Sequence, residues 1–362
     1  LILIGQIRTN EKDGLAQLVE DGWSFFGDLD GSEEVLLTIK LLKKTGSLPG
    51  IDQYSAEAIW AAIEAYRSGG DEGVTEADIK GPEWRVLIDP SPVNDYPHFM
   101  SEAVSVPNGF QSKIARVLLL KRLREVNALL GFTRVEAPDD SGGSGSGPIQ
   151  APLSRTKPDW VPANQVHGEG IFIQFDEQSI AEWERGAEVQ AADVSLRGGH
   201  KGWRNSRHLR PPEDRYPGAR YVMLHTLAHL LIRELALECG YNAASIRERI
   251  YAEVSEEGNQ CGFIIYTAAA DSDGTLGGLV ELGKPENLER LLVQALRRAR
   301  ICSSDPLCAE HDPQKDRSLH AAACHACSFV AETSCERGNR YLDRAMVVPT
   351  FENAKAAFFE GA

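Results

Sequence analysis

The chain has 362 residues, of which 42% are hydrophobic, and its formal net charge at neutral pH is -15. That length allows two or three domains, and that composition is ordinary for a folded soluble protein. The acidic balance argues against a free-standing nucleic-acid binder, because phosphate binding needs clustered positive charge. It still allows a local basic surface, or a partner protein with a basic face.

The chain is expected to be cytoplasmic and to make no membrane contact. Its first residues show no positively charged stretch followed by an apolar one, the pattern of a secretory leader. No apolar run reaches the roughly 18 residues that a membrane-spanning helix requires.

Residues 1–138 are predicted to form a mixed α/β region. The apolar spacing predicts four elements there: helices over 33–44, 55–67 and 112–130, and a strand over 85–89. Residues 139–150 are rich in glycine and serine and predict a linker or loop.

Residues 151–350 are predicted to form a helix-rich domain, followed by a tail over 351–362. The expected elements, in chain order, are a strand over 168–175, a helix over 180–192, a long apolar helix over 217–239, an amphipathic helix over 244–256, a strand over 261–269 and a helix over 285–301. The whole chain is therefore predicted to have an α+β fold.

Five of the seven cysteines crowd into one segment near the C-terminus: Cys302, Cys308, Cys324, Cys327 and Cys335. Without a sign of secretion, such crowding favours metal binding over disulfides. Cys324 and Cys327 form a C-x-x-C turn, which lets two thiolates converge on one ion. Tetrahedral zinc needs four ligands, so five cysteines compete for four places in a structural zinc site.

The segment between these cysteines has little apolar content, so zinc would supply the free energy that orders it. Three histidines, His311, His320 and His325, could each replace one thiolate. The alternatives are free thiols, a redox dithiol at the C-x-x-C turn, and an iron–sulfur cluster.

Residues 197–220 form a basic segment that is a candidate for DNA contact. Arginine can grip phosphates and tryptophan can stack on an unpaired base. The candidate residues are Arg197, Lys201, Trp203, Arg204, Arg207 and Arg210. The competing interpretation is a solvated loop, or arginines paired with the carboxylates of this acidic chain.

His225 and His229 lie one helical turn apart in the apolar helix. A zinc protease of this spacing needs a glutamate after the first histidine as general base, and Thr226 stands there instead. We interpret the pair as core or interface histidines. The alternatives are a second metal site and a metal-dependent hydrolase that uses the two histidines.

The order of features resembles the zinc-binding domain of MrfA-like helicases. The segments that carry this resemblance are HTLAHLLI, FIIYTA, DSDGTLGGLVEL, CSSDPLC, CHAC and ETSCERGNRYLDRA. RLREVNALLGFTRVEAP, APLSRTKPDWVPA and GEGIFIQFDE are also similar to DrmB-like components of DISARM anti-phage defence systems. The resemblance covers about residues 84–348.

The resemblance implies a role within a complex, but it does not imply a catalysed reaction. DrmB-like proteins partner a DrmA-type helicase, and the pair engages phage DNA. This chain would then be a non-catalytic, zinc-stabilised scaffold subunit, with the family's zinc cysteines carried onto the five C-terminal cysteines. The five-residue spacing between Cys302 and Cys308 departs from the family's tighter pair. The remaining alternative is a protein-interaction module without DNA contact.

Overall fold

The computed structural model describes most of the chain. The described residues are 15, 18–19, 22–26, 29, 31–45, 48, 50–67, 76–91, 93, 97–129, 131–132, 151–152, 154, 160–240, 243–255, 258–267, 278–316 and 318–360. They fall into two compact units, one within residues 6–79 and one within residues 80–362. The predicted Gly/Ser linker at 139–150 lies outside the described residues.

The smaller unit is helical. Its elements are α2 (Trp23–Phe26), α3 (Ser32–Thr45), η1 (Ile51–Gln53) and α4 (Ala56–Arg67). Apolar side chains at helical spacing on α3, such as Val35 and Ile39, pack with Ile59 and Ile63 of α4 in one buried cluster. The helices predicted over 33–44 and 55–67 are confirmed.

The larger unit is built on a five-stranded antiparallel sheet. In spatial order its strands are β1 (Phe99–Val104), β2 (Ile114–Ala128), β5 (Ala163–Phe175), β7 (Gly262–Thr267) and β6 (Ile246–Tyr251). A separate two-stranded sheet pairs β3 (Gly131–Phe132) with β4 (Ala151–Pro152).

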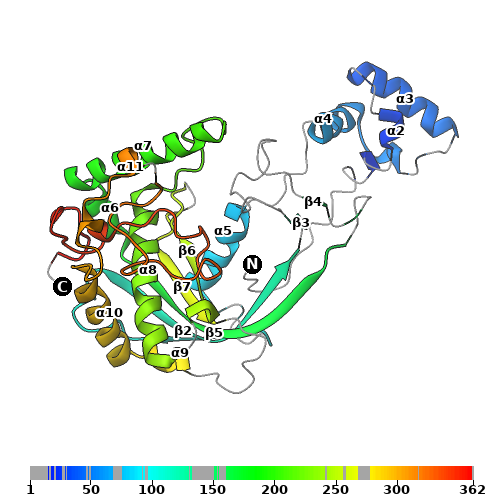
Figure 1. The fold of residues 1–362 in the computed structure, drawn as a ribbon. Coiled ribbons are helices and arrows are strands. Elements are labelled where there is room, and N and C mark those ends of the chain that lie inside the picture. Colours follow the sequence, from blue (N-terminus) through cyan, green and yellow to red (C-terminus); the bar gives the residue numbers. More distant parts are fainter. Residues whose placement is uncertain are drawn as a thin grey trace. The chain divides into compact units, whose positions relative to one another are not determined.

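Helices pack against this sheet (Figure 1). Ten helical elements accompany it in the described part of the larger unit: α5 (Glu76–Ile88), α6 (Glu177–Glu184), α7 (Ala187–Ser206), α8 (Gly218–Cys239), η2 (Ala243–Ser245), α9 (Gly278–Leu282), α10 (Pro285–Ala299), η3 (Pro306–Ala309), α11 (Pro313–Asp316) and η4 (Arg344–Met346). Helix α8 packs on β6 and β7 and is flanked by α7 and α10. Together the helices and the sheet confirm the α+β fold class.

Two segments with helical composition turn out to be strands. Residues 112–130 were predicted as a helix, but Ile114–Ala128 is β2, which pairs with β1 on one side and β5 on the other. Residues 244–256 were also predicted as a helix, but Ile246–Tyr251 is β6. Leucine, arginine and glutamate favour helices in isolation, yet ladder hydrogen bonds and burial within a sheet override such weak preferences.

The opposite error falls on residues 85–89, which were predicted as a strand. They form the last turn of α5 and the residue after it. Trp84 on this helix packs edge-on against Phe172 of β5 and near Tyr251 of β6. The apolar residues therefore face the sheet from a helix and do not join it.

Sheet pairing and burial connect segments that the predicted domain organisation listed separately. Strands β2 and β5 lie on either side of the predicted linker, and they pair along nearly their full length. Residues 351–362 were predicted as a tail, but Phe358 and Phe359 are buried and their amides bond to the carbonyls of Met346 and Val347. Pairing in the sheet therefore joins segments that are distant in the sequence.

Among the described residues, no helix combines the length and the apolar character that crossing a membrane requires.

Close packing at the centre of the sheet makes Gly170 of β5 sensitive to substitution. A Cβ atom there would lie 2.8 Å from the Ile265 carbonyl oxygen on β7. We expect Gly170→Ala to lower the free energy of unfolding by about 1–3 kcal/mol, because backbone cannot move aside cheaply. Guanidinium denaturation of the zinc-bound protein measures this.

Gly202→Ala on α7 is the matched control. Apart from its chain neighbours and the adjacent helix backbone, no heavy atom of the described residues lies within 4 Å of its Cβ position, so the helix gains up to about 1 kcal/mol. Equal effects of the two substitutions would contradict the packing argument.

Candidate metal centre

Four cysteine sulfurs converge at the C-terminal side of α10. The thiols of Cys302, Cys308, Cys324 and Cys327 all lie within 4.8 Å of one another. The Sγ–Sγ distances are 3.6 Å for Cys302–Cys324, 3.6 Å for Cys324–Cys327 and 3.9 Å for Cys308–Cys327. A tetrahedron with zinc–sulfur bonds of about 2.3 Å has edges of about 3.8 Å. The sulfurs are too far apart for disulfides, whose bond is about 2.05 Å.

Local backbone structure sets up this convergence. Cys302 follows α10, and Cys308 lies in the 3-10 helix η3, which the Asp305 carboxylate caps. Between Cys324 and Cys327 the chain makes a tight turn, closed by the Cys327 and Ser328 amides, which donate to the Cys324 carbonyl. The turn places the two sulfurs of the C-x-x-C pair on the same side.

Several hydrogen-bond donors surround the sulfurs. The Asp305 amide donates to Cys302 Sγ at 3.3 Å, and the Cys324 amide and the Ser328 hydroxyl donate to Cys327 Sγ at 3.3 Å each. Such donors partly offset the charge of thiolates bound to a divalent ion.

Arg344 brings a positive charge to the same sulfurs. Its side chain is 1% exposed, and Nη2 donates to Cys308 Sγ at 2.9 Å. Its other nitrogens donate to the carbonyls of Ala299 and Ala322. Burial raises the pKa of the Cys308 thiol, and the guanidinium opposes that rise. Arg344 therefore compensates buried negative charge and ties α10 to the C-terminal segment.

Arg233 of α8 holds the C-x-x-C turn from the helix side. Its guanidinium donates to the carbonyls of Ala326 at 2.6 Å and Phe329 at 3.0 Å. Neither Arg233 nor Arg344 was identified from the sequence. Both lie far along the chain from the groups they contact, so no local spacing could have revealed them.

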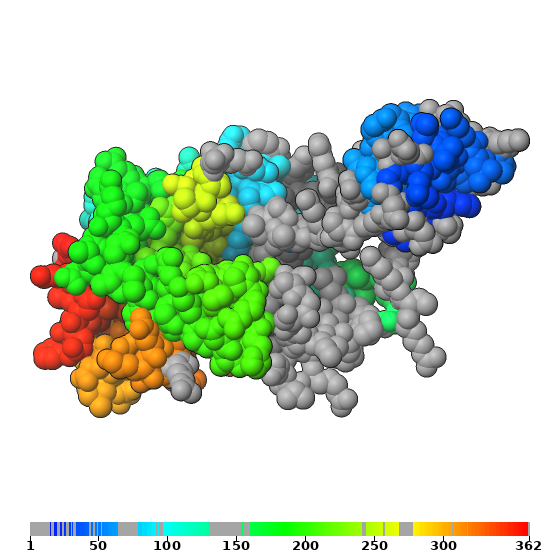
Figure 2. Space-filling view, turned by 90° about the horizontal axis from the view of Figure 1, so that it is seen from above, coloured from blue at the N-terminus to red at the C-terminus, as the bar shows by residue number. Residues whose placement is uncertain are grey.

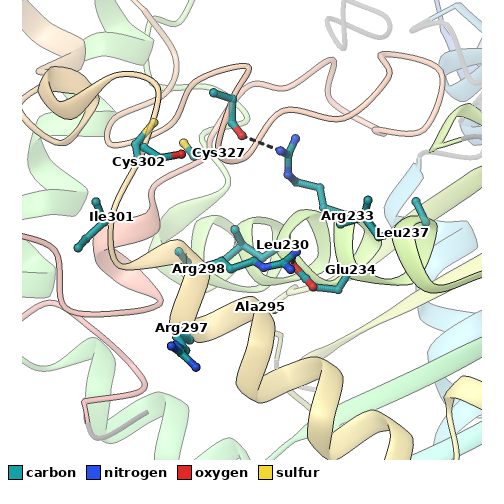
Figure 3. Close-up of a pocket in the computed structure, with 14 residues that line it drawn as sticks. Leu230, Arg233, Glu234, Leu237, Ala295, Arg297, Arg298, Ile301, Cys302 and Cys327 are labelled. Atoms are coloured by element: carbon teal, nitrogen blue, oxygen red, sulfur yellow. Dashed lines mark hydrogen bonds and ion pairs between the residues drawn. The ribbon is translucent and has the colours of Figure 1, made fainter.

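A surface pocket of about 760 Å³ adjoins the four-cysteine cluster. Helices α8 and α10 form its sides, with Cys302 and Cys327 at one end and Leu237 at the other (Figure 3). Leu237 and Ile301 are 70% and 78% exposed, so large apolar side chains face solvent here.

The fifth cysteine lies in a different group of side chains. Cys335 clusters with His225, His229 and Glu248, whose potential ligand atoms are also within 4.8 Å of one another, and all four residues are buried. The sequence had grouped Cys335 with the other cysteines and had interpreted the histidines as core residues. Glu248 was missed, because it lies in the segment expected to be an amphipathic helix.

The three histidines predicted as possible substitutes for a thiolate do not join the four-cysteine group. His311 and His320 stack on each other with ring centroids 4.7 Å apart, and His325 packs edge-on against Phe329. Four thiols complete the tetrahedron without them.

The first half of the basic segment is the end of α7, which runs to Ser206. Several of its cations face acids of the same chain: Arg197 lies 2.8 Å from Asp193, Lys201 lies 2.8 Å from Glu213, and Arg204 lies 3.3 Å from Asp214. Arg204 is also only 3% exposed, so its guanidinium stabilises the folded chain and is not available to bind DNA.

Two candidate residues of this segment, Arg207 and Arg210, are exposed. The Arg207 guanidinium lies 4.4 Å from the centre of the Trp203 ring, and Arg340 lies 5.5 Å from the same ring. The structure therefore adds Arg340, from the C-terminal segment, to the cations around Trp203. In Figure 2 the C-terminal residues, drawn in orange and red, lie beside the green residues of the helices.

The donor chemistry and geometry identify the class of domain. A family model described as the MrfA Zn-binding domain matches residues 227–328, which include all four converging cysteines and exclude Cys335. The chain therefore contains a zinc-binding domain of the MrfA class, and the four sulfurs at tetrahedral spacing confirm zinc as its metal.

The similarity extends well beyond that domain. Over 320 residues the chain is 38% identical to the DISARM protein DrmB of Bacillus paralicheniformis, a match that covers 87% of this chain and 55% of the relative. The chain thus spans about half the length of this curated relative. The predicted resemblance to DrmB is confirmed.

Loss of one converging cysteine should release one zinc. We expect Cys324→Ser to lower the zinc content by one equivalent per chain, because three thiolates and a hydroxyl bind the ion far more weakly. Metal analysis by plasma mass spectrometry after gel filtration measures the change.

Cys239→Ser is the control for the zinc measurement. Cys239 belongs to neither group of potential ligands and burial raises the pKa of its thiol to about 11, so it should be inert. Equal zinc loss in both variants would contradict the assignment.

Proposed function

We propose that this chain is a non-catalytic, zinc-stabilised scaffold subunit of an anti-phage defence complex. In this role it pairs with a DrmA-type helicase and contributes to DNA binding. The observation that carries the proposal is the 38% identity to a DISARM protein DrmB across 87% of the chain. The site argues for a structural role, since four thiolates fill a tetrahedral zinc shell and leave no position for a substrate.

A metal-dependent hydrolase that uses His225 and His229 is the rival. A catalytic zinc ion keeps one position open to water, but both histidines are fully buried. The hydroxyl of Thr226, at the position of the protease glutamate, donates to the Val222 carbonyl. These observations favour the scaffold over the hydrolase.

The surface around Trp203, formed with Arg207, Arg210 and Arg340, is our candidate for DNA contact. Arginine guanidiniums suit phosphate oxygens, and those of Arg207 and Arg340 come together at Trp203 from two distant segments. Arg210 is exposed in the same segment as Arg207. Arg197 and Lys201 are partly exposed but paired with acids, so they would contribute less. The Arg207 guanidinium packs on the Trp203 ring, so a base that stacks on that face would first have to displace it.

The pocket between α8 and α10 is our candidate for the helicase contact. Leu237 and Ile301 are exposed at its edges, and Arg233, Arg297 and Arg298 supply polar anchors in its lining. Protein interfaces typically combine an apolar centre with arginine. Because Cys302 and Cys327 line one end, zinc binding would hold this surface in shape.

The DNA contact predicts a change in salt dependence. In the complex of the full-length protein with its helicase, Arg207→Ala/Arg210→Ala should weaken DNA binding. The slope of log affinity against log salt concentration should fall by about 2, because about two phosphate contacts are lost. Fluorescence anisotropy at several salt concentrations measures the slope.

Arg290→Ala provides the control for the DNA experiment. Arg290 is a partly exposed arginine of α10 that pairs with Glu238, so its loss should leave the slope unchanged. If the double variant keeps the slope of the unmodified complex, the protein-interaction module without DNA contact becomes the better explanation.

The pocket predicts which substitutions separate the subunits. Leu237→Glu/Ile301→Glu should weaken binding to a co-expressed DrmA-type helicase by at least about tenfold, or about 1.4 kcal/mol, because charge replaces apolar contact. Affinity pull-down with full-length protein, followed by titration, measures the loss.

Val254→Glu is the matched control for the pull-down. Val254 is 65% exposed and does not line the pocket, so the helicase should still bind. If neither variant weakens the pair, the pocket is not the contact. If the unmodified proteins fail to associate, the proposed pairing itself is wrong.

A further inference from the structure

Four side chains from three parts of the fold meet at a second buried point. His225 and His229 come from α8, Glu248 from β6 and Cys335 from the C-terminal segment. His225 Nε2 lies 2.8 Å from Glu248 Oε1 and 3.1 Å from Cys335 Sγ. His229 Nε2 lies 3.2 Å from the same carboxylate oxygen. One nitrogen from each ring, one oxygen and one sulfur therefore surround a common centre.

The outer nitrogens of both rings are already engaged. His229 Nδ1 lies 2.9 Å from the Ser328 carbonyl oxygen, and His225 Nδ1 lies 3.3 Å from the Tyr341 carbonyl oxygen. A carbonyl oxygen can only accept, so each Nδ1 carries the proton that it donates. In a neutral imidazole the lone pair is then on Nε2 and points to the common centre. Metal-binding histidines are oriented in the same way by backbone carbonyls.

Backbone groups also surround the sulfur of Cys335. The amides of Arg337 and Asn339 donate to Cys335 Sγ at 3.4 and 3.2 Å. The same arrangement of amides supports the sulfurs of the four-cysteine cluster. Burial and the Glu248 carboxylate raise the pKa of the Cys335 thiol, and the two amides oppose that rise, so this sulfur has the donors that a metal-bound sulfur receives.

Charge and burial also suit a cation at the centre. Glu248 is 4% exposed, and its Oε2 atom has no hydrogen-bond partner among the described residues. Buried polar atoms are normally paired, and leaving one oxygen of a buried carboxylate without a partner is costly. One carboxylate, one thiolate and two neutral imidazoles together balance the charge of one divalent ion.

We propose that His225, His229, Glu248 and Cys335 form a second metal site, which binds zinc with a structural role. Two nitrogens, one sulfur and one oxygen are ligand types that zinc accepts in tetrahedral geometry. All four ligands are buried and fill the tetrahedron, so the site has no open position for a substrate. This site does not depend on the proposed defence function.

The second site joins the layers of the larger unit. It links α8 and β6 to the chain around Cys335, beyond the matched zinc-binding domain, which ends at residue 328. Ser328 connects the two sites directly, because its hydroxyl donates to Cys327 Sγ while its carbonyl accepts from His229. Each metal would therefore help to order the ligands of the other.

X-ray absorption at the zinc edge tests the proposal on the unmodified protein. Purified from zinc-supplemented medium, the protein should hold two zinc ions per chain. Five sulfur and three nitrogen or oxygen ligands are shared between the two ions. One zinc per chain with a shell of four sulfurs would overturn the proposal, because the second group would then be a hydrogen-bonded cluster only.

Paired variants assign the second ion to its ligands. Cys335→Ser should hold one zinc with an all-sulfur shell, whereas Cys239→Ser should keep both ions. The all-sulfur zinc that remains in Cys335→Ser shows that the domain is still folded. If Cys335→Ser fails to fold, Glu248→Gln gives the same readout with a smaller change, because it removes only the ligand charge. Two zinc ions in both ligand variants would overturn the assignment.

Discussion

Helix α8 is buried on nearly every side, so each of its polar side chains needs a partner inside the protein. The rest of the larger unit depends on this constraint. A polar group removed from water must find a partner, since an unpaired buried group costs several kcal/mol. His225, His229 and Arg233 lie along this helix. Glu248 of β6 contacts both histidines, and the other partners come from the segment that follows α10: carbonyls at Ala326, Ser328 and Tyr341, and the Cys335 sulfur. The apolar faces of α8 pack on the sheet, while its polar groups hold the C-terminal segment.

The C-terminal segment needs these attachments because much of it has no regular secondary structure. Its described residues between Ile301 and Thr350 contain only short helical turns. Zinc ligands, Arg344 and the groups on α8 replace the backbone ladders that a sheet or long helix would provide. Structural zinc is most valuable where a segment cannot bury enough apolar surface to order itself. Zinc therefore orders the surface next to it, including the pocket between α8 and α10. A partner protein would bind to that ordered surface.

Several features follow from the sequence because they depend on near neighbours. The C-x-x-C turn, the long apolar helix α8 and the amphipathic helix α10 all follow from the spacing of cysteine or apolar residues over a few positions. The C-terminal cysteines also predicted zinc correctly, since thiolates in that number suit few other ions. The assignments that failed concern residues whose partners are distant. Ile114–Ala128 has helical composition and becomes a central strand, because two other strands pair with it.

The sequence by itself determined the zinc chemistry, the helical character of α8 and the resemblance to DrmB. Only the tertiary structure decided which cysteines converge, where Cys335 lies and which basic residues come together around Trp203. Arg204 is engaged with Asp214, whereas Arg340 joins Arg207 at Trp203 from more than 130 positions along the chain. The reason is physical: residue type sets what a group can bind, but its partners depend on long-range packing. Glu248 illustrates this, because a glutamate on an exposed helix would be solvated, while on β6 it faces two buried histidines.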